Sequence, residues 1–184
     1  KYFGLTAICL LLSIPASADQ KLTDLVGDIQ PAVATVISYD IENKIASIGS
    51  GFFINRKGHL ITNYHVIVGN FSVIIKMSDG KKYPVKNVIA ENQTADLVKL
   101  AVDIPEDAVK WVRVSDELPA IAEQIIVVGS PLGLEQTVSV GIISAVRNLP
   151  NGDKFFQLSA PISQGSSGSP VVNMQGNVVG VVSF

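Results

Sequence analysis

Three residues of this chain carry the side chains that an acyl-transfer site needs, in the order His65, Asp96 and Ser167. A serine hydroxyl is a weak nucleophile at neutral pH, so it needs an imidazole to take its proton and a third group to hold that imidazole in one tautomer. Ser167 lies in the glycine-bounded segment 165–170, GSSGSP, which is typical of a tight turn. The three residue types predict nucleophilic catalysis, with Ser167 as the nucleophile, His65 as the base and Asp96 as the acid that orients it.

The glycine two residues before Ser167 has a physical role of its own. Gly165 allows the backbone N–H groups of Gly165 and Ser167, on either side of Ser166, to converge on one point. Two such donors stabilise the negative charge that develops on a substrate oxygen, and a side chain at position 165 would tilt the peptide away. A turn without a catalytic role would also use a glycine here. Gly165, Ser166 and Ser167 are therefore our candidates for an oxyanion hole.

The local surroundings separate His65 and Asp96 from the other histidine and the other acids. His65 is predicted to close a strand, whereas His59 directly follows a glycine in a turn and is interpreted as solvated. Asp96 begins an apolar strand, where an unpaired buried carboxylate would be costly, and a histidine partner would remove that cost. The remaining acids, such as Asp79, Asp116 and Glu117, lie in polar turns and are interpreted as solvated.

The order of the three residues excludes one rival fold and weakens another. An α/β-hydrolase needs its histidine after the nucleophile, but no histidine follows Ser167, and Ser169 stands where its nucleophile turn has a glycine. A subtilisin-like order needs an aspartate before His65, and three are present, Asp24, Asp28 and Asp40. The β-rich pattern of the chain, however, does not fit that α/β fold.

Short β-rich segments make up most of the chain and must position these residues. A helix is predicted over Leu22–Ile29, where Pro31 ends it. The predicted strands are 33–37, 50–54, 59–62 and 72–76, then 125–128, 137–146 and 154–158, and the hairpin 170–172 with 177–182. Asp79-Gly80 is the strongest hairpin signal.

A less apolar stretch, 103–119, separates the strands into two sets. Two β-rich halves joined by a linker suggest paired β-barrels, which close their own edges. We predict an all-β fold with an N-terminal half at 19–115 that includes the short helix, and a C-terminal half at 116–184. His65 and Asp96 belong to the first half and Ser167 to the second, so the predicted site lies in the crevice between them.

The first eighteen residues have the pattern of an export signal: a basic start, an apolar run from Tyr2 to Ile14 and a small-residue cleavage site ending at Ala18. The run is too short to span a bilayer, so we expect no stable membrane insertion of the mature chain. Cys9, the only cysteine, lies within this run, and two histidines leave little for a zinc site, so we expect no metal and no cofactor. The net charge of −2 argues against nucleic acid as a partner.

Seven segments resemble the trypsin-like serine proteases of chymotrypsin fold and, within them, the HtrA/Deg family of exported bacterial proteases. They are SGFFI at 50–54, LITNYHV at 60–66, DG at 79–80, ADLVKL at 95–100, GSPLGL at 129–134, VSVGIIS at 138–144 and GSSGSP at 165–170. The resemblance implies two antiparallel six-stranded β-barrels, a His65–Asp96–Ser167 triad and an acyl-enzyme on Ser167. It also implies protein or peptide substrates and a homo-oligomer, commonly a trimer.

The resemblance also implies where substrate binds. Pro161 and Ile162, six and five residues before Ser167, correspond to an apolar pocket floor without a carboxylate, so we expect cleavage after small or medium aliphatic residues rather than after Lys or Arg. Ser183 and Phe184 resemble the start of the strand that lines substrate, and the rest of that strand, the closing helix and any PDZ domain are not in the sequence. Where the family usually has glycine, Ser169 adds a Cβ beside the nucleophile's turn, which we expect to lower efficiency.

The sequence supports an exported serine endopeptidase acting on proteins, including unfolded ones. The alternative is a non-catalytic, chaperone-like binding module that keeps the fold without turning over substrate. The intact set of three residues favours catalysis. An esterase would share the acyl chemistry, and turnover of peptides against simple esters separates the two.

Overall fold

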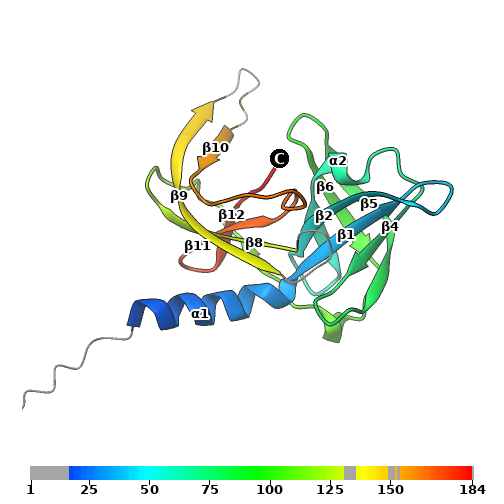
Figure 1. Ribbon diagram of the computed structural model, residues 1–184, viewed down its shortest axis with the longest axis horizontal. Coiled ribbons are helices and arrows are strands. Elements are labelled where there is room, and N and C mark those ends of the chain that lie inside the picture. Colours follow the sequence, from blue (N-terminus) through cyan, green and yellow to red (C-terminus); the bar gives the residue numbers. More distant parts are fainter. Residues whose placement is uncertain (1–16, 131–135, 149–151, 153, 184) are drawn as a thin grey trace, which may run out of the picture.

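The computed structural model describes residues 17–130, 136–148, 152 and 154–183. Strands dominate it, in two sets that face each other across the centre of the molecule (Figure 1). The first set is a closed barrel with the strand order β1-β2-β3-β6-β5-β4. Its strands are β1 (Val33–Tyr39), β2 (Ile45–Phe53), β3 (His59–Thr62), β4 (Ser72–Lys76), β5 (Lys82–Asn92) and β6 (Leu97–Val102).

In β3 and β6, buried side chains alternate with partly buried ones, so that one face of each of these strands fills the barrel interior. In β6 the alternate residues Val98, Leu100 and Val102 are all buried. They pack in one cluster with residues of other strands, such as Phe53, Leu60 and Ile75. The Asp79-Gly80 turn joins β4 to β5 as predicted, with Gly80 at φ +84° and Lys76 paired with Lys82.

The second set is a six-stranded sheet with the order β10-β9-β8-β11-β12-β7. Its strands are β7 (Arg113–Val114), β8 (Gln124–Gly129), β9 (Thr137–Asn148), β10 (Lys154–Leu158), β11 (Pro170–Asn173) and β12 (Asn177–Val181). The all-β, chymotrypsin-like fold class is thereby confirmed, with one difference. Among the described residues this second sheet is open, because its end strands β10 and β7 do not pair with each other.

The short strand β7 belongs to the second sheet, although its residues lie in the part of the chain that we assigned to the N-terminal half. It precedes residue 116, yet it pairs in parallel with β12 of the second sheet, with Arg113 opposite Asn177. Between β6 and β7 lies the 3₁₀ turn η2 (Glu106–Ala108). The stretch expected to act as a linker therefore contributes a strand to the second half.

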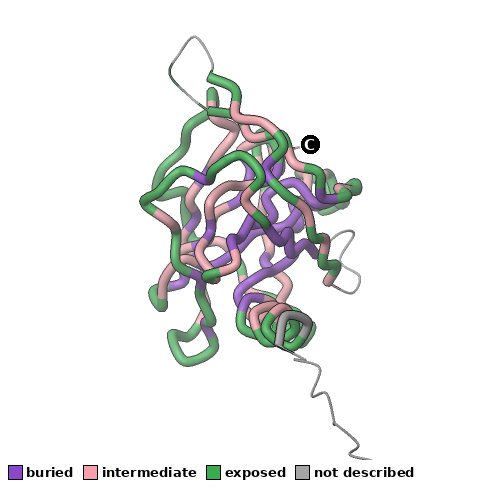
Figure 2. Tube along the Cα trace, turned by 90° about the vertical axis from the view of Figure 1, so that its left-hand side faces the viewer, coloured by how far each residue is buried: buried purple, intermediate pink, exposed green. Residues whose placement is uncertain are grey.

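Helix α1 (Ser17–Ile29) runs beneath the second sheet toward the start of β1 and begins earlier than the predicted Leu22 (Figure 1). The helix ends as expected where Pro31 enters the 3₁₀ turn η1 (Gln30–Ala32). Its apolar face packs on a cluster that combines the barrel with the second sheet, formed by Val33 and Phe52 with Ile126, Val128 and Val172. This shared cluster holds the two halves together, and Figure 2 shows buried segments gathered in the middle and exposed loops around them.

Candidate active site

His65 lies in a one-turn helix, α2 (Tyr64–Ile67), which follows β3 directly. The prediction that His65 closes a strand was therefore wrong by a few residues, because the chain turns into this helix after Thr62. Val66, the next residue, is 1% exposed and packs in the barrel core, so the helix is anchored beside the histidine. The His65 side chain itself is 44% exposed, which leaves it accessible from the crevice.

The carboxylate of Asp96 contacts both the backbone and the ring of His65. Asp96 Oδ1 accepts a hydrogen bond from the backbone N–H of His65 at 2.9 Å, and Oδ2 lies 2.7 Å from His65 Nδ1. The backbone of Asp96 has φ +53°, a left-handed conformation that non-glycine residues rarely adopt. Its carbonyl accepts a hydrogen bond from Asn63 Nδ2 at 2.9 Å, which helps to keep this conformation in place. The predicted pairing of histidine and acid is present in the structure.

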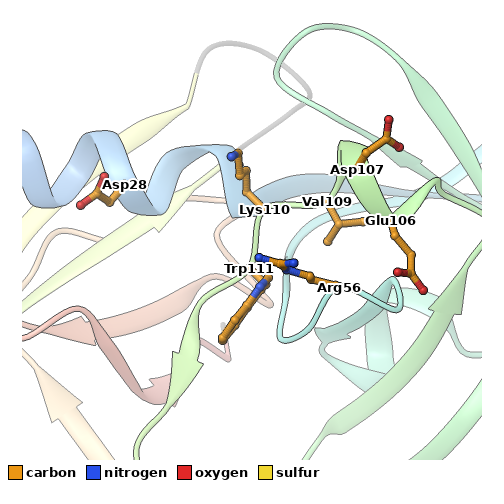
Figure 3. A pocket seen from close by; sticks show the side chains of 7 residues that line it. All are labelled: Asp28, Arg56, Glu106, Asp107, Val109, Lys110 and Trp111. Carbon is orange, nitrogen blue, oxygen red and sulfur yellow. The ribbon is translucent and has the colours of Figure 1, made fainter.

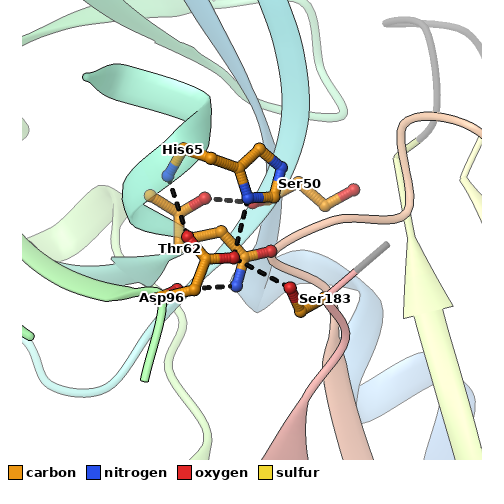
Figure 4. Close-up of polar contacts among 6 residues, drawn as sticks. Ser50, Thr62, His65, Asp96 and Ser183 are labelled. Carbon is orange, nitrogen blue, oxygen red and sulfur yellow. Dashed lines mark hydrogen bonds and ion pairs between the residues drawn. The ribbon is translucent and has the colours of Figure 1, made fainter. Parts of the chain in front are cut away.

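A further donor supports the carboxylate. Ser183 Oγ donates a hydrogen bond to Asp96 Oδ2 at 2.8 Å, as the dashed line in Figure 4 shows. Sequence reasoning assigned Ser183 to the substrate-lining strand and missed this contact, because nothing local connects residues 87 positions apart. Phe184, assigned with it, lies outside the described residues.

The environment of Asp96 favours its ionised form. Burial raises the pKa of Asp96, but the hydrogen bonds from the His65 backbone, the Ser183 hydroxyl and the His65 ring outweigh it, so the pKa lies below its ordinary value. Asp96 is therefore an anion at neutral pH. An anion beside Nδ1 keeps the proton of a neutral imidazole on that nitrogen and leaves Nε2 as the base.

The loop that carries Ser167 lies against strand β2 of the barrel. The carbonyl oxygen of Ser167 accepts a hydrogen bond from the backbone N–H of Ser50 in β2 at 2.7 Å. A Cβ added at Gly49 would lie 2.8 Å from the Val66 side chain and 3.0 Å from the Ser167 carbonyl oxygen. Because Gly49 has no side chain, Val66 and the carbonyl of Ser167 can both lie close to β2 at this point.

The loop packs closely against the barrel at Gly168. Its φ of +86° lies in the left-handed region, and an added Cβ would overlap the carbonyl oxygen of Ser50 and lie 2.5 Å from Thr62 Oγ1. Ser167 itself is only 6% exposed. Glycine at position 168 is required both by its backbone conformation and by the space around it.

The oxyanion-hole candidates divide into two groups. Gly165 has φ +89°, in the left-handed region that glycine adopts without strain. The backbone N–H of Ser166 donates to the carbonyl of Ser163 at 3.0 Å, so this amide already has an acceptor within the loop. The amides of Gly165 and Ser167 stay as the predicted pair of donors.

The backbone at Ser169 is compatible with a residue other than glycine. The described non-glycine residues with positive φ are Asn43, Asp96 and Ala122, so the backbone at position 169 does not require glycine. Ser169 is 0% exposed, and its Oγ has no hydrogen-bond partner among the described residues. What the serine adds at this position is a buried unpaired hydroxyl.

The second histidine is less solvated than expected. His59 lies in β3, is half-buried, and its Nδ1 is 2.9 Å from Asn55 Nδ2. Burial, followed by the positive charges of Lys99 and Lys57, lowers the pKa of His59. The solvated interpretation of His59 was wrong, because the strand places its ring against the Asn55 turn.

The hollows on the described surface include one that adjoins the candidate site and one that lies away from it. A pocket of about 200 Å³ is lined by Pro161 and Ile162, by Ser163 and Ser166 of the nucleophile's loop, and by residues of β8 and β9, none of them charged. The other, about 470 Å³, lies near the end of α1 and contains none of the predicted site residues (Figure 3). It is lined by Asp28, Arg56, Glu106, Asp107, Val109, Lys110 and Trp111.

In the part of the chain that the structure describes, His, Cys, Asp and Glu form no group of three that could hold a metal ion. Over the same residues, no helix has both the length and the apolar character needed to cross a membrane.

The fold and the Asp96–His65 pair are of the kind found in trypsin-like peptidase domains. The chain belongs to the family of trypsin-like peptidase domains, whose profile matches residues 49–181.

Relatives specify the family further and confirm the resemblance to HtrA/Deg-like proteases. A probable periplasmic serine endoprotease DegP-like protein of Rhizobium meliloti is 40% identical over 139 residues, covering 72% of this chain and 27% of the relative. The periplasmic serine endoprotease DegP of Salmonella typhimurium is 32% identical over 146 residues, covering 76% and 30%.

The solved structures agree with these relatives. The serine endoprotease from Yersinia pestis superposes with a TM-score of 0.76 at 30% identity, covering 93% of this chain and 59% of that one. The HtrA-type protease AlgW with tripeptide has a TM-score of 0.75 at 28% identity, covering 86% and 52%. The chain thus spans less than a third of the length of the two DegP relatives.

Proposed function

We propose that this chain is the protease domain of an exported serine endopeptidase, which hydrolyses peptide bonds in proteins through an acyl-enzyme on Ser167. The observation that carries the proposal is the Asp96–His65 pair. Its carboxylate is bonded to both the ring and the backbone of the histidine, at 2.7 and 2.9 Å. A histidine that served only the core would not need its ring held this way while 44% of its side chain is exposed.

In the proposed reaction, Ser167 Oγ attacks the scissile carbonyl carbon while His65 Nε2 takes the hydroxyl proton. The resulting imidazolium is stabilised by Asp96, whose charge is kept by the donors around it. The C–N bond then breaks as His65 returns the proton to the leaving amine, which leaves the acyl group on Ser167. Water, deprotonated by His65, attacks this ester in turn, releasing the carboxylic acid product and the free serine.

The amides of Gly165 and Ser167 are the proposed donors to the oxyanion formed in both steps. The φ of +89° at Gly165 supports this role, because it allows the two peptides on either side of Ser166 to turn the same way. Loss of one such donor lowers turnover by about a hundred- to a thousand-fold in comparable enzymes.

The proposed substrates are proteins or peptides with a small or medium aliphatic residue before the cleaved bond. The uncharged pocket that includes Pro161 and Ile162 supports this preference, since it offers no carboxylate to a basic side chain. A digest of a peptide library should give cleavage mainly after aliphatic residues. Cleavage mainly after Lys or Arg would contradict the preference.

Export and self-association complete the proposal. The apolar run within residues 1–18 supports export, and the relatives' names include the periplasm. Residues 1–16 lie outside the described part of the chain, so the test is N-terminal sequencing of the exported protein, which we expect to begin at Asp19. We also expect a homo-oligomer, a trimer as the family resemblance implies, which light scattering would measure.

Casein digestion by the full-length mature protein, beside a folded Ser167→Ala variant, tests the catalytic proposal. Removal of a triad member lowers turnover by several orders of magnitude, so only the parent should cleave. Labelling by a fluorophosphonate should likewise occur in the parent alone. If neither protein cleaves or is labelled while both are folded, the binding-module alternative replaces the enzyme.

A further inference from the structure

Ser50, in the middle of β2, makes polar contacts with both halves of the molecule. Within the barrel, its carbonyl accepts a hydrogen bond from Thr62 Oγ1 at 2.7 Å (Figure 4). Toward the second half, its backbone N–H donates to the Ser167 carbonyl at 2.7 Å and its hydroxyl donates to the Gly165 carbonyl at 2.9 Å. Ser50 is 0% exposed, so water cannot take over these contacts. One buried serine thus reaches the loop on both sides of Ser166.

The hydroxyl of Ser50 is itself held in one orientation. The backbone N–H of Ser130 donates to Ser50 Oγ at 3.0 Å, and Ser130 Oγ in turn lies 2.7 Å from Thr35 Oγ1. Thr35 and Ser130 are 2% and 5% exposed. Because Oγ accepts from Ser130, its proton is left for the Gly165 carbonyl, which is the remaining partner.

The Gly165 carbonyl belongs to the peptide unit between the two proposed oxyanion donors. The N–H of that same unit, on Ser166, donates to the Ser163 carbonyl at 3.0 Å. A peptide unit is planar, so contacts at its two ends fix the orientation of the whole unit. Glycine at position 165, with φ +89°, has little intrinsic preference to keep the unit in place. The donor peptides before and after it turn with it.

We propose that Ser50 is a positioning residue for the oxyanion hole and acts through the carbonyl of Gly165. The inference rests on the proposed peptidase function. The two proposed oxyanion donors lie in the second half of the chain, and the inference adds a residue of the first barrel that keeps them in place. Without the Ser50 hydroxyl, the Gly165 peptide can rotate, and the amides of Gly165 and Ser167 no longer aim at one point. Catalysis should then decrease although Ser167, His65 and Asp96 are all present.

The test compares Ser50→Ala with the parent on an ester substrate and on its thionoester, in which sulfur replaces the carbonyl oxygen. Sulfur accepts hydrogen bonds poorly, so thionoester turnover draws little on the oxyanion hole. We expect Ser50→Ala to lower kcat/KM for the oxygen ester by about ten- to a hundred-fold, because misplacing donors is less damaging than deleting one. The thionoester rate should change much less, so that the ratio of the two rates decreases.

Ser38→Ala is the matched control. Ser38 is also in the first barrel and 0% exposed, and its hydroxyl donates to a backbone carbonyl, that of Val66, at 2.7 Å. The control loses a comparable hydrogen bond without touching the nucleophile's loop, so its rate ratio should equal that of the parent. An equal decrease in both rates for Ser50→Ala would indicate general loosening and would overturn the proposal.

Ser50→Cys covers the case in which Ser50→Ala does not fold. A thiol keeps the branching of the side chain, with a larger atom that is a weaker donor, so the rate ratio of this variant should lie below that of the parent. A folded Ser50→Cys or Ser50→Ala with the parent's ratio would refute the positioning role while the peptidase proposal stands. A parent that neither turns over ester nor is labelled by fluorophosphonate would refute both.

Discussion

The hydroxyl of Ser169, which has no hydrogen-bond partner among the described residues, should lower the free energy of unfolding. Its Oγ is buried without a partner among the described residues, and leaving such a group unsatisfied costs about 1–3 kcal/mol. Ser169→Ala removes the hydroxyl and keeps the Cβ, so it relieves that cost and leaves only a very small gap in the packing. We expect the free energy of unfolding to increase by about 1 kcal/mol, which corresponds to a rise in Tm of roughly 2–4 °C for a chain of this size.

The same substitution at Ser38 should have the opposite sign. Ser38 is equally buried, but its hydroxyl donates to the Val66 carbonyl at 2.7 Å, so Ser38→Ala loses a hydrogen bond and leaves an acceptor less satisfied. We expect a decrease of about 1–2 kcal/mol in the free energy of unfolding. Urea unfolding followed by circular dichroism measures both variants under one condition. Equal destabilisation by the two substitutions would show that Ser169 has a partner, such as a buried water, and would refute the reasoning.

Three more predictions concern the acid and the turn. Asp96→Asn should lower kcat/KM by about a thousand- to ten-thousand-fold, because an amide can stabilise the wrong tautomer of His65. Kinetics on a peptide substrate measure this effect. A loss below tenfold would contradict the role assigned to Asp96. Because the pKa of Asp96 is lower in the folded protein than in the unfolded chain, its ionisation contributes stability that is complete above about pH 4 and is lost as the pH falls through the lower folded value. Urea unfolding in this acidic range should therefore show a smaller dependence on pH in Asp96→Asn than in the parent. Gly168→Ala should abolish soluble expression or fluorophosphonate labelling, since the added Cβ would overlap the Ser50 carbonyl; an active Gly168→Ala protein would mean that the loop can relocate.

Local patterns in the sequence were sufficient for many of the elements. The strands His59–Thr62, Ser72–Lys76 and Lys154–Leu158 begin and end where their β-rich composition and the nearby turn residues predicted. The hairpin at Asp79-Gly80 also matches its prediction. These features depend on residues within a few positions of one another, whose preferences for strand or turn act without the rest of the chain. Helix α1 began before its apolar spacing did, because polar residues can extend a helix without contributing to that pattern.

The pairing of His65 with Asp96 was also accessible from sequence, because an acid at the start of an apolar strand requires a partner. The contacts that complete the site were not. Ser183 reaches Asp96 across 87 positions and Ser50 reaches Gly165 across 115, and neither serine has a local pattern that distinguishes it from other serines of the chain. Such contacts arise only when the barrel and the second sheet pack together. Residue types and their order thus determine the chemistry that this chain can perform, whereas the packing of its two halves determines which polar groups support that chemistry, because burial and hydrogen-bond partners are properties of the assembled fold.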